Sequence, residues 1–128
     1  DEQKRGLFSF GDDITLNVTL QRNKGFEMDT KTVMSIIIMT LNRTKICNLE
    51  IPIGDILEGT TTWSLRYRGK VLLPNKYMIQ VVTHIPNVRY YDRQDACMFT
   101  VFDNGTEFLK YNGTDNGFID FKPEVERQ

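Results

Sequence analysis

Strict alternation of apolar and polar side chains is the feature that most constrains how this chain can fold. The segment ITLNVTLQ (residues 14–21) has an apolar residue at every second position, and TTTWSLRYRG (residues 60–69) repeats the pattern. Successive side chains of a β-strand point to opposite faces, so both segments are predicted to be strands with one buried and one solvated face. The alternation places Trp63 on the buried face and Arg66 on the solvated face.

Further strands are predicted along most of the chain. Residues 32–41 (TVMSIIIMTL) are apolar almost throughout and rich in β-branched side chains, which indicates a central strand covered on both faces. The other candidates are residues 45–51, 76–85, 96–103 and 118–121. With about eight or nine strands and no convincing amphipathic helix, the sequence predicts an all-β fold, an antiparallel β-sandwich of the immunoglobulin-like or jelly-roll type.

The organisation of the chain is predicted to be simple. Its 128 residues suffice for one domain with a proper core. No repeat or linker divides it, so we expect a single β-sandwich domain over residues 1–128, with residues 122–128 as a charged tail. The amino end, DEQKR, is charged, no apolar segment follows it, and no initiating Met precedes it. We therefore expect no signal peptide and a chain excised from a longer protein.

Charge and hydropathy argue against two classes of partner. The formal net charge is −1, and the 26% of residues that are charged mix both signs. A nucleic-acid binder would show a basic excess or stripe, so no nucleic-acid partner is expected. No apolar run approaches the roughly 20 residues needed to cross a bilayer, so we also expect no direct membrane insertion.

Sequence patterns for catalysis and for a bound metal fail in this chain. It has neither a phosphate-binding Gly-rich loop nor a Gly-x-Ser-x-Gly motif, and His84 is the one histidine that a catalytic triad could use. Three loop carboxylates could form a calcium site, but they lack its regular spacing and fit turns better. They are Asp103, Asp115 and Asp120. We expect no enzyme activity, no cofactor and no metal site.

Cysteines and Asn-x-Thr triplets bear on the cellular compartment. Cys47 and Cys97 each lie in an apolar-patterned run, so we predict buried, reduced thiols, with a disulfide bridge as the alternative. Four Asn-x-Thr triplets would accept glycans in a secreted eukaryotic protein. They begin at Asn17, Asn42, Asn104 and Asn112. Two of the triplets are also Asn-Gly turns, so an extracellular location stays open without being established.

A more specific pattern runs from residue 72 to residue 119. It reads Leu-Leu-Pro-x-x-Tyr-x-Ile-x-Val, then Ala-x-x-Phe-x-Val and a turn. It resembles the carboxy-terminal carbohydrate-binding domain of the nucleotide-binding subunit of bacterial O-antigen polysaccharide ABC exporters. The resemblance spans roughly residues 5–121. The matching residues are Leu73, Pro74, Tyr77, Ile79, Val81, Phe99, Val101 and Gly117-Phe118-Ile119. Asn75 stands where the family prefers Gly, and Phe121 where it often has Trp.

The resemblance implies a function and a cellular setting. It implies a non-catalytic β-sandwich that dimerises and binds the capped non-reducing end of the finished O-antigen polysaccharide. It also implies partners, namely the exporter's ATPase and membrane subunits, and a cytoplasmic location at the inner face of the bacterial inner membrane. Two other functions stay open. One is an extracellular adhesion or receptor domain, and the other is a sugar-binding module appended to a glycosidase.

The resemblance also directs attention to VRYYDRQ (residues 88–94), which we predict to be the loop joining strand 76–85 to strand 95–102. Sugar sites use aromatic faces against apolar C–H patches, and Arg where the ligand is anionic. We therefore predict one carbohydrate-binding surface. Its members are Gln80, His84, Arg89, Tyr90 and Tyr91, with Arg66 as a weaker one.

Two alternatives to that surface remain open. In the first, the tyrosines pack over a corner of the sandwich and the arginines are solvated. In the second, the apolar stripe on the same face is a dimer interface. The stripe consists of Met78, Val82, Met98 and Phe102.

Overall fold

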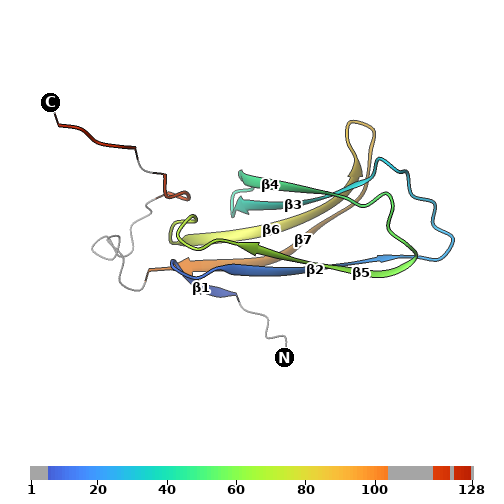
Figure 1. Cartoon of the computed structure of the whole chain (residues 1–128), viewed down its shortest axis with the longest axis horizontal. Helices are drawn as coiled ribbons and strands as arrows, with labels where there is room; N and C mark the ends of the chain where they lie inside the picture. The colour runs from blue at the N-terminus through green and yellow to red at the C-terminus, as the bar shows by residue number, and fades with distance from the viewer. Residues whose placement is uncertain (1–5, 104–116, 122, 128) are drawn as a thin grey trace.

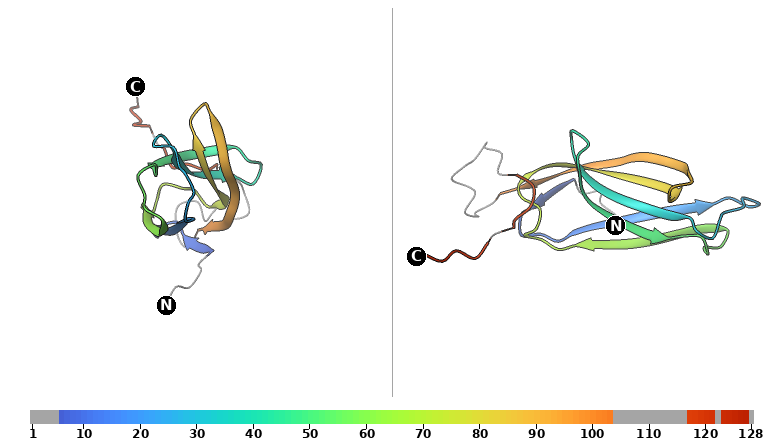
Figure 2. Two further views of the ribbon diagram at one scale, coloured as in Figure 1. Left: turned by 90° about the vertical axis from the view of Figure 1, so that its right-hand side faces the viewer. Right: turned by 90° about the horizontal axis from the view of Figure 1, so that it is seen from above.

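The computed structural model describes residues 6–103, 117–121 and 123–127, and its regular elements are all β-strands (Figure 1). The strands are β1 (Leu7–Ser9), β2 (Ile14–Arg22), β3 (Val33–Thr40), β4 (Lys45–Pro52), β5 (Gly59–Tyr67), β6 (Asn75–Ile85) and β7 (Arg89–Phe102). They form two layers, which are seen from two further directions in Figure 2. The predicted all-β sandwich is therefore confirmed.

The two layers are unequal. One is a five-stranded sheet with the order β1-β7-β6-β3-β4, and the other pairs β2 with β5. All pairs are antiparallel except β1 with β7, which is parallel. The described residues hold seven strands, fewer than the eight or nine expected. One reason is that residues 118–121 form no strand but a single bridge between Leu72 and Ile119.

The β2–β5 pair follows the sequence pattern without interruption. Its register runs from Ile14 opposite Tyr67 to Arg22 opposite Gly59 with no shift. Apolar side chains of both strands pack on the core, and Trp63 is half-buried among them, as the alternation predicts. The outer side of the pair carries short polar side chains such as Thr19 and Thr62, because alternation keeps every second residue in water.

The position of strand β3 in the sheet explains why its sequence is apolar almost throughout. It lies between β4 and β6, and all of its residues but the first are buried. Met34, Ile36 and Ile38 belong to the main core between the layers. Ile37 and Met39 point the other way and pack with Met78 and Val82 of β6 in a second, smaller cluster. The prediction of a central strand covered on both faces is confirmed.

Tyr77 is the centre of the segment that carries the family resemblance. It is 0% exposed, its ring stacks on Phe99 at 5.2 Å, and its hydroxyl donates to the carbonyl of Leu73. The same hydroxyl lies 3.1 Å from the carbonyl of Phe118. A buried hydroxyl needs such partners because burying it unpaired costs about 1–3 kcal/mol. Tyr77 therefore fixes residues 117–119 against the start of β6.

The cysteine prediction is half right. Neither Cys47 nor Cys97 is in a disulfide, but both are exposed, so the predicted burial is wrong. Each cysteine faces the inner side of the sheet by register, opposite Ile38 and Ile79 respectively. Both lie close to the margins of the sandwich, since β4 is an edge strand and β1 covers only the end of β7. Alternation predicts which face a residue takes, and the strand's place in the sheet decides its burial.

Several sequence features can be placed only in part. Asn17 and Asn42 are exposed, whereas Asn104 and Asn112 lie outside the described residues, as do Asp115 and most of the predicted Asn-Gly turns. Within the described residues there is no group of three or more His, Cys, Asp or Glu side chains that could hold a metal ion. No helix in the described part of the chain is long and apolar enough to cross a membrane.

Candidate functional site

The candidate site lies on the side of the five-stranded sheet that faces away from β2 and β5, here called the outer face. Residues paired across antiparallel strands share a face, so the register of β6 with β7 defines its centre. The pairs are His84 with Tyr90, Val82 with Arg93, Gln80 with Asp95, and Met78 with Met98. The outer face is thus aromatic and charged at one end and apolar at the other.

Two β-bulges bring these β7 residues to one face. The register shifts between Ile79 and Gln80 and again between Thr83 and His84, leaving Ala96 and Tyr91 of β7 unmatched. Each extra residue reverses the alternation of β7, because successive side chains otherwise point to opposite faces. As a result, Tyr90, Arg93, Asp95 and Met98 share the outer face although their spacings are three, two and three residues.

Three side chains form a stack at the polar end of the outer face. The rings of His84 and Tyr90 are 5.5 Å apart with an interplanar angle of 26°, and Arg93 Cζ lies 4.8 Å from the centroid of Tyr90. Ser35 Oγ on β3 is 2.9 Å from His84 Nε2 and holds that ring in place. Tyr90 is nevertheless 64% exposed, so the stack orients its ring and leaves much of its surface accessible.

A hydrogen-bonded group of three residues adjoins the stack. Asp95 accepts two bonds from Arg43, at 3.2 and 2.6 Å, and a third at 3.1 Å from the amide of Gln80. Arg43 belongs to the turn between β3 and β4, which rises above the outer side of the sheet (Figure 2, right). Its backbone adopts a φ of 65°, an uncommon conformation outside glycine. The turn thus reaches over the sheet to a residue on β7.

Charge and hydrogen bonding stabilise the ionised form of this pair. The bonds from Arg43 and then Gln80, together with the positive charges of Arg43 and Arg93, lower the pKa of Asp95 from its ordinary value. The same bond raises the pKa of Arg43. Both side chains are largely in water, so we assign the pair a role in shape and orientation.

The residues predicted as one surface are divided among three places. Gln80, His84 and Tyr90 are together on the outer face. Arg89 and Tyr91 lie on the other side of β7, where Arg89 Cζ is 4.6 Å from the Tyr91 centroid and the Tyr91 ring packs edge-on against Phe26 at 5.8 Å. Arg66 is separate from both groups.

Arg66 lies on the outside of the opposite layer. It belongs to β5, which pairs only with β2, and its Nε is 3.9 Å from a carboxylate oxygen of Asp13. Its strand therefore does not adjoin the outer face, and the structure does not bring Arg66 together with the other predicted residues. The strand pattern gave the outward direction of Arg66 correctly, but it could not say which sheet contains β5.

The prediction that residues 88–94 form a loop is also wrong. VRYYDRQ is almost entirely strand, since β7 begins at Arg89 and the turn comprises only residues 86–88. Pro86 supplies a fixed φ, and Asn87 adopts a φ of 61°, so these two residues close the hairpin tightly. The site also includes four residues that the sequence analysis did not assign to it. They are Ser35, Arg43, Arg93 and Asp95.

Comparisons with known proteins bear on the fold. A scan of the sequence against protein-family models found no match, and a search of curated proteins found none. Among solved structures, this chain is similar to one described as the C-terminal domain of Wzt. The TM-score is 0.59 at 15% sequence identity, over 94% of this chain and 73% of that one. At this identity the likeness shows a shared fold.

Proposed function

We propose that this chain is a non-catalytic domain that recognises a polysaccharide through the outer face. The observation that carries the proposal is the stack of His84, Tyr90 and Arg93, in which an ordered tyrosine stays 64% exposed. An aromatic ring that is held in one orientation and still exposed offers a ligand a contact surface at little ordering cost. A tyrosine suits the C–H surface of a sugar ring because it has an apolar ring face and a polar hydroxyl.

The surroundings of the stack support a sugar ligand. Arg43 and Asp95 are exposed and supply planar donor and acceptor groups, which match the paired hydroxyls of a sugar, and the buried Gln80 supports Asp95 by its bond. Their mutual bonds fix their positions, so a ligand would not have to order them. We expect weak to moderate affinity, because loss of water from sugar hydroxyls offsets most of the hydrogen-bond gain.

The particular polysaccharide that we propose is a bacterial O-antigen chain. The sequence resemblance over residues 72–119 supports this, and the fold shared with the C-terminal domain of Wzt is consistent with it. In this proposal the outer face binds the capped non-reducing end. The domain then presents the polymer to the ATPase and membrane subunits of an ABC exporter, on the cytoplasmic side of the inner membrane.

A single domain and a homodimer complete the proposal. We treat residues 1–128 as one domain, because the strands of both layers contribute to one main core cluster.

The apolar end of the outer face would form the dimer contact, since Met98 and Phe102 are 69% and 37% exposed there. Sedimentation velocity of the wild-type chain and of Met98→Lys tests this. A monomeric wild-type chain would remove the dimer from the proposal.

Exposed Asn17 and Asn42 favour a second candidate, an extracellular adhesion domain. Expression through the secretory pathway of a eukaryotic host, followed by mass spectrometry, tests whether either asparagine carries a glycan. Glycan occupancy would favour this candidate, and bare asparagines would remove the observation that supports it. A module attached to a glycosidase would use the same outer face, and the sequence of the full-length protein distinguishes it from an exporter domain.

Calorimetry tests the main proposal. The ligand is the long-chain polysaccharide purified from the source cells, used intact and after removal of its terminal residue. We expect the intact form to bind and Tyr90→Ala to weaken binding about tenfold, in line with the loss of one aromatic contact. Thr62→Ala, on the other layer, is the matched control. Equal binding of both forms would remove the capped end from the proposal, and no binding would remove the polysaccharide.

A further inference from the structure

The two tyrosines of β7 belong to separate clusters. Tyr90 stacks with His84 and Arg93 on the outer face, whereas Tyr91 contacts Phe26 and Arg89 on the other side of the strand. The division follows from the strand itself, because successive side chains of a β-strand point to opposite faces. Each cluster has the same composition, an aromatic pair with a guanidinium group over the tyrosine ring.

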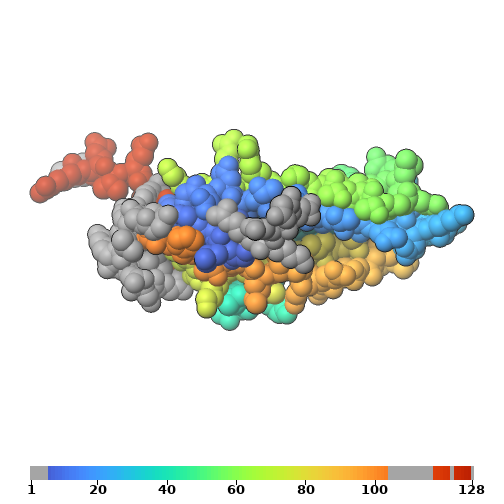
Figure 3. Space-filling model, turned by 90° about the horizontal axis from the view of Figure 1, so that it is seen from below, coloured from blue at the N-terminus to red at the C-terminus, as the bar shows by residue number. Residues whose placement is uncertain are grey.

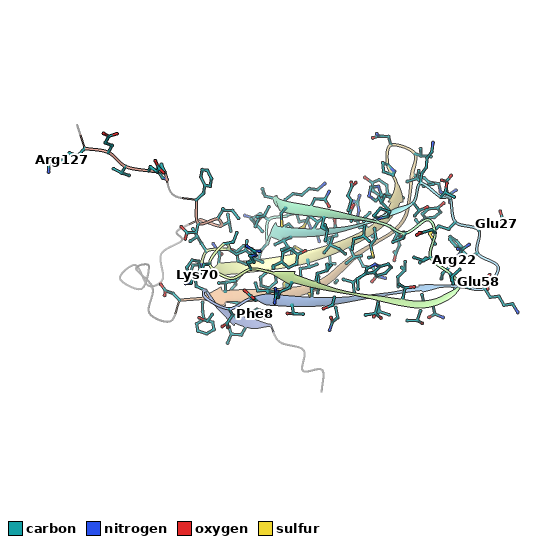
Figure 4. The ribbon with its side chains drawn as sticks, in the orientation of Figure 1. Phe8, Arg22, Glu27, Glu58, Lys70 and Arg127 are labelled. Carbon is teal, nitrogen blue, oxygen red and sulfur yellow. The ribbon has the colours of Figure 1, made fainter. Side chains whose placement is uncertain are left out.

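The cluster of Phe26, Tyr91 and Arg89, here called the edge cluster, is held in position by hydrogen bonds from Arg22. Arg22 donates two bonds to the carbonyl of Phe26, at 3.3 and 3.1 Å, and one at 2.6 Å to the carbonyl of Ile56. Arg22 lies at the end of the molecule where Glu27 and Glu58 are also labelled in Figure 4. Phe26 remains 43% exposed although its backbone is fixed. The edge cluster is therefore an ordered aromatic surface.

Arginine in both clusters is available to a ligand. Arg89 and Arg93 each lie over a tyrosine, and neither forms an ion pair with a carboxylate in the described part of the chain. A guanidinium group that lies on an aromatic ring still directs its N–H groups outward in its own plane. Both arginines can therefore donate hydrogen bonds to hydroxyl or acidic oxygens of a bound molecule.

An open sheet edge runs between the two clusters. Among the described residues, β1 pairs only with residues 100–102 of β7, so residues 89–95 have a neighbour on the β6 side alone. Figure 3 shows β7 (orange) at the surface beside the neighbouring layer (blue). Backbone N–H and C=O groups at such an edge are not used by a second strand and can bind a ligand.

The edge is unsuited to a protein strand. Two bulges interrupt it, and Asp92, Arg93 and Asp95 place charges along it. Bulges and charged side chains are the features by which sheet edges avoid pairing with another chain. A polymer of hydroxyl-bearing rings needs no regular ladder of backbone bonds, so it fits this edge better than a peptide does.

We infer that the edge cluster is a second contact site for the same polysaccharide, and that the polymer passes over the edge of β7 from the outer face to the edge cluster. This inference rests on the proposed function. The outer face takes one part of the chain, and Phe26, Tyr91 and Arg89 take sugar units farther along it. Because the two sites lie on opposite sides of the strand, only a chain of several sugars reaches both. Binding should therefore strengthen with chain length.

The test uses polysaccharide from the source cells, both intact and as size-fractionated short fragments that keep the terminal residue. Titrations compare the wild-type chain with Tyr90→Ala, Arg89→Gln and Arg68→Gln. Arg89 and Arg68 are both exposed, so neither change should prevent folding, and Arg68, which directly follows β5, is the control. We expect Arg89→Gln to weaken binding of long chains about fivefold and to leave short fragments unaffected. Tyr91→Leu should act in the same direction.

The outcomes separate the two proposals. Loss of long-chain affinity in Arg89→Gln, with short-fragment affinity kept, supports the second site. Unchanged long-chain affinity in Arg89→Gln, while Tyr90→Ala weakens all binding, overturns the second site and leaves the proposed function standing. If the wild-type chain binds neither long chains nor short fragments, both proposals fail.

Discussion

The outsides of the two layers differ although both belong to the same sandwich. The outside of the β2–β5 pair carries Thr, Ser, Asn, Gln and one Arg side chain in unbroken alternation, and Thr19 and Thr62 bond across it at 3.0 Å. The outer face of the five-stranded sheet has a buried apolar cluster under its surface and, at one end, the stack of His84, Tyr90 and Arg93. The outside of the β2–β5 pair is solvent-exposed along its length, whereas the outer face is partly buried and carries an ordered group of side chains.

Bulges account for much of this difference. A regular strand spaces its outward residues evenly, two positions apart, so large side chains are spread along it. The two bulges of β7 change that spacing and gather Tyr90, Arg93 and Asp95 around β6. Regular alternation therefore forms the framework of the sandwich, whereas its interruption at the bulges forms the candidate site.

The largest expected effect is a difference in the free energy of unfolding between one substitution in the outer face and one on the outside of the β2–β5 pair. Ile37→Ala should lower the free energy of unfolding by about 2–4 kcal/mol, because it leaves a cavity in the small cluster under the outer face. Thr62→Ala should change it by less than about 0.5 kcal/mol. Urea denaturation of both variants measures this. Equal effects would mean that the outer face is as wet as the β2–β5 side.

A smaller effect is expected from one hydrogen bond on each side. Ser35→Ala should cost about 1–2 kcal/mol, since Ser35 is buried and its loss leaves His84 Nε2 without its partner. Thr19→Ala removes an exposed bond and should cost less than about 0.5 kcal/mol. Thermal denaturation provides the measurement. If Ser35→Ala is as mild as Thr19→Ala, the histidine is not held by that bond.

The smallest effect is a pH dependence confined to the outer face. The pKa of Asp95 is lower in the folded chain than its ordinary value of 3.8, so its ionised form stabilises the fold. That contribution is complete above the unfolded-state pKa and is lost as the pH falls through the lower folded-state pKa. Asp95→Asn should therefore lose less stability than the wild-type chain on acidification below about pH 4. Parallel acid-denaturation curves would contradict this.

Most strands of the sandwich could be predicted from the sequence, because the hydrophobic pattern that indicates each strand is local. Strands β2 and β5 each carry unbroken alternation, and β3 is apolar enough to require cover on both faces. The predicted strands 45–51 and 76–85 match β4 and β6 to within one residue. In each of these segments, the pattern that predicts the strand lies within the segment itself and does not depend on residues elsewhere in the chain.

The candidate site could be predicted only in part, because its geometry is not local. Gln80 and His84 were assigned to the right face, since β6 alternates regularly. Asp95 shares its parity with Cys97, so alternation places both on the inner side, and only the bulge at Ala96 moves Asp95 outward. The bond from Arg43 to Asp95 joins residues 52 positions apart and has no sequence signal.

A map of ligand contacts on the folded domain would show which face of the sandwich binds the polysaccharide. Backbone amide signals are followed by two-dimensional NMR while the source-cell polysaccharide is added. We expect shifts concentrated in β6 and β7 around His84, Tyr90 and Arg93, with the signals of the outward residues of β2 and β5 unmoved. Shifts concentrated on the β2–β5 side would contradict it, as would a saturating titration that leaves the Tyr90 signal unchanged.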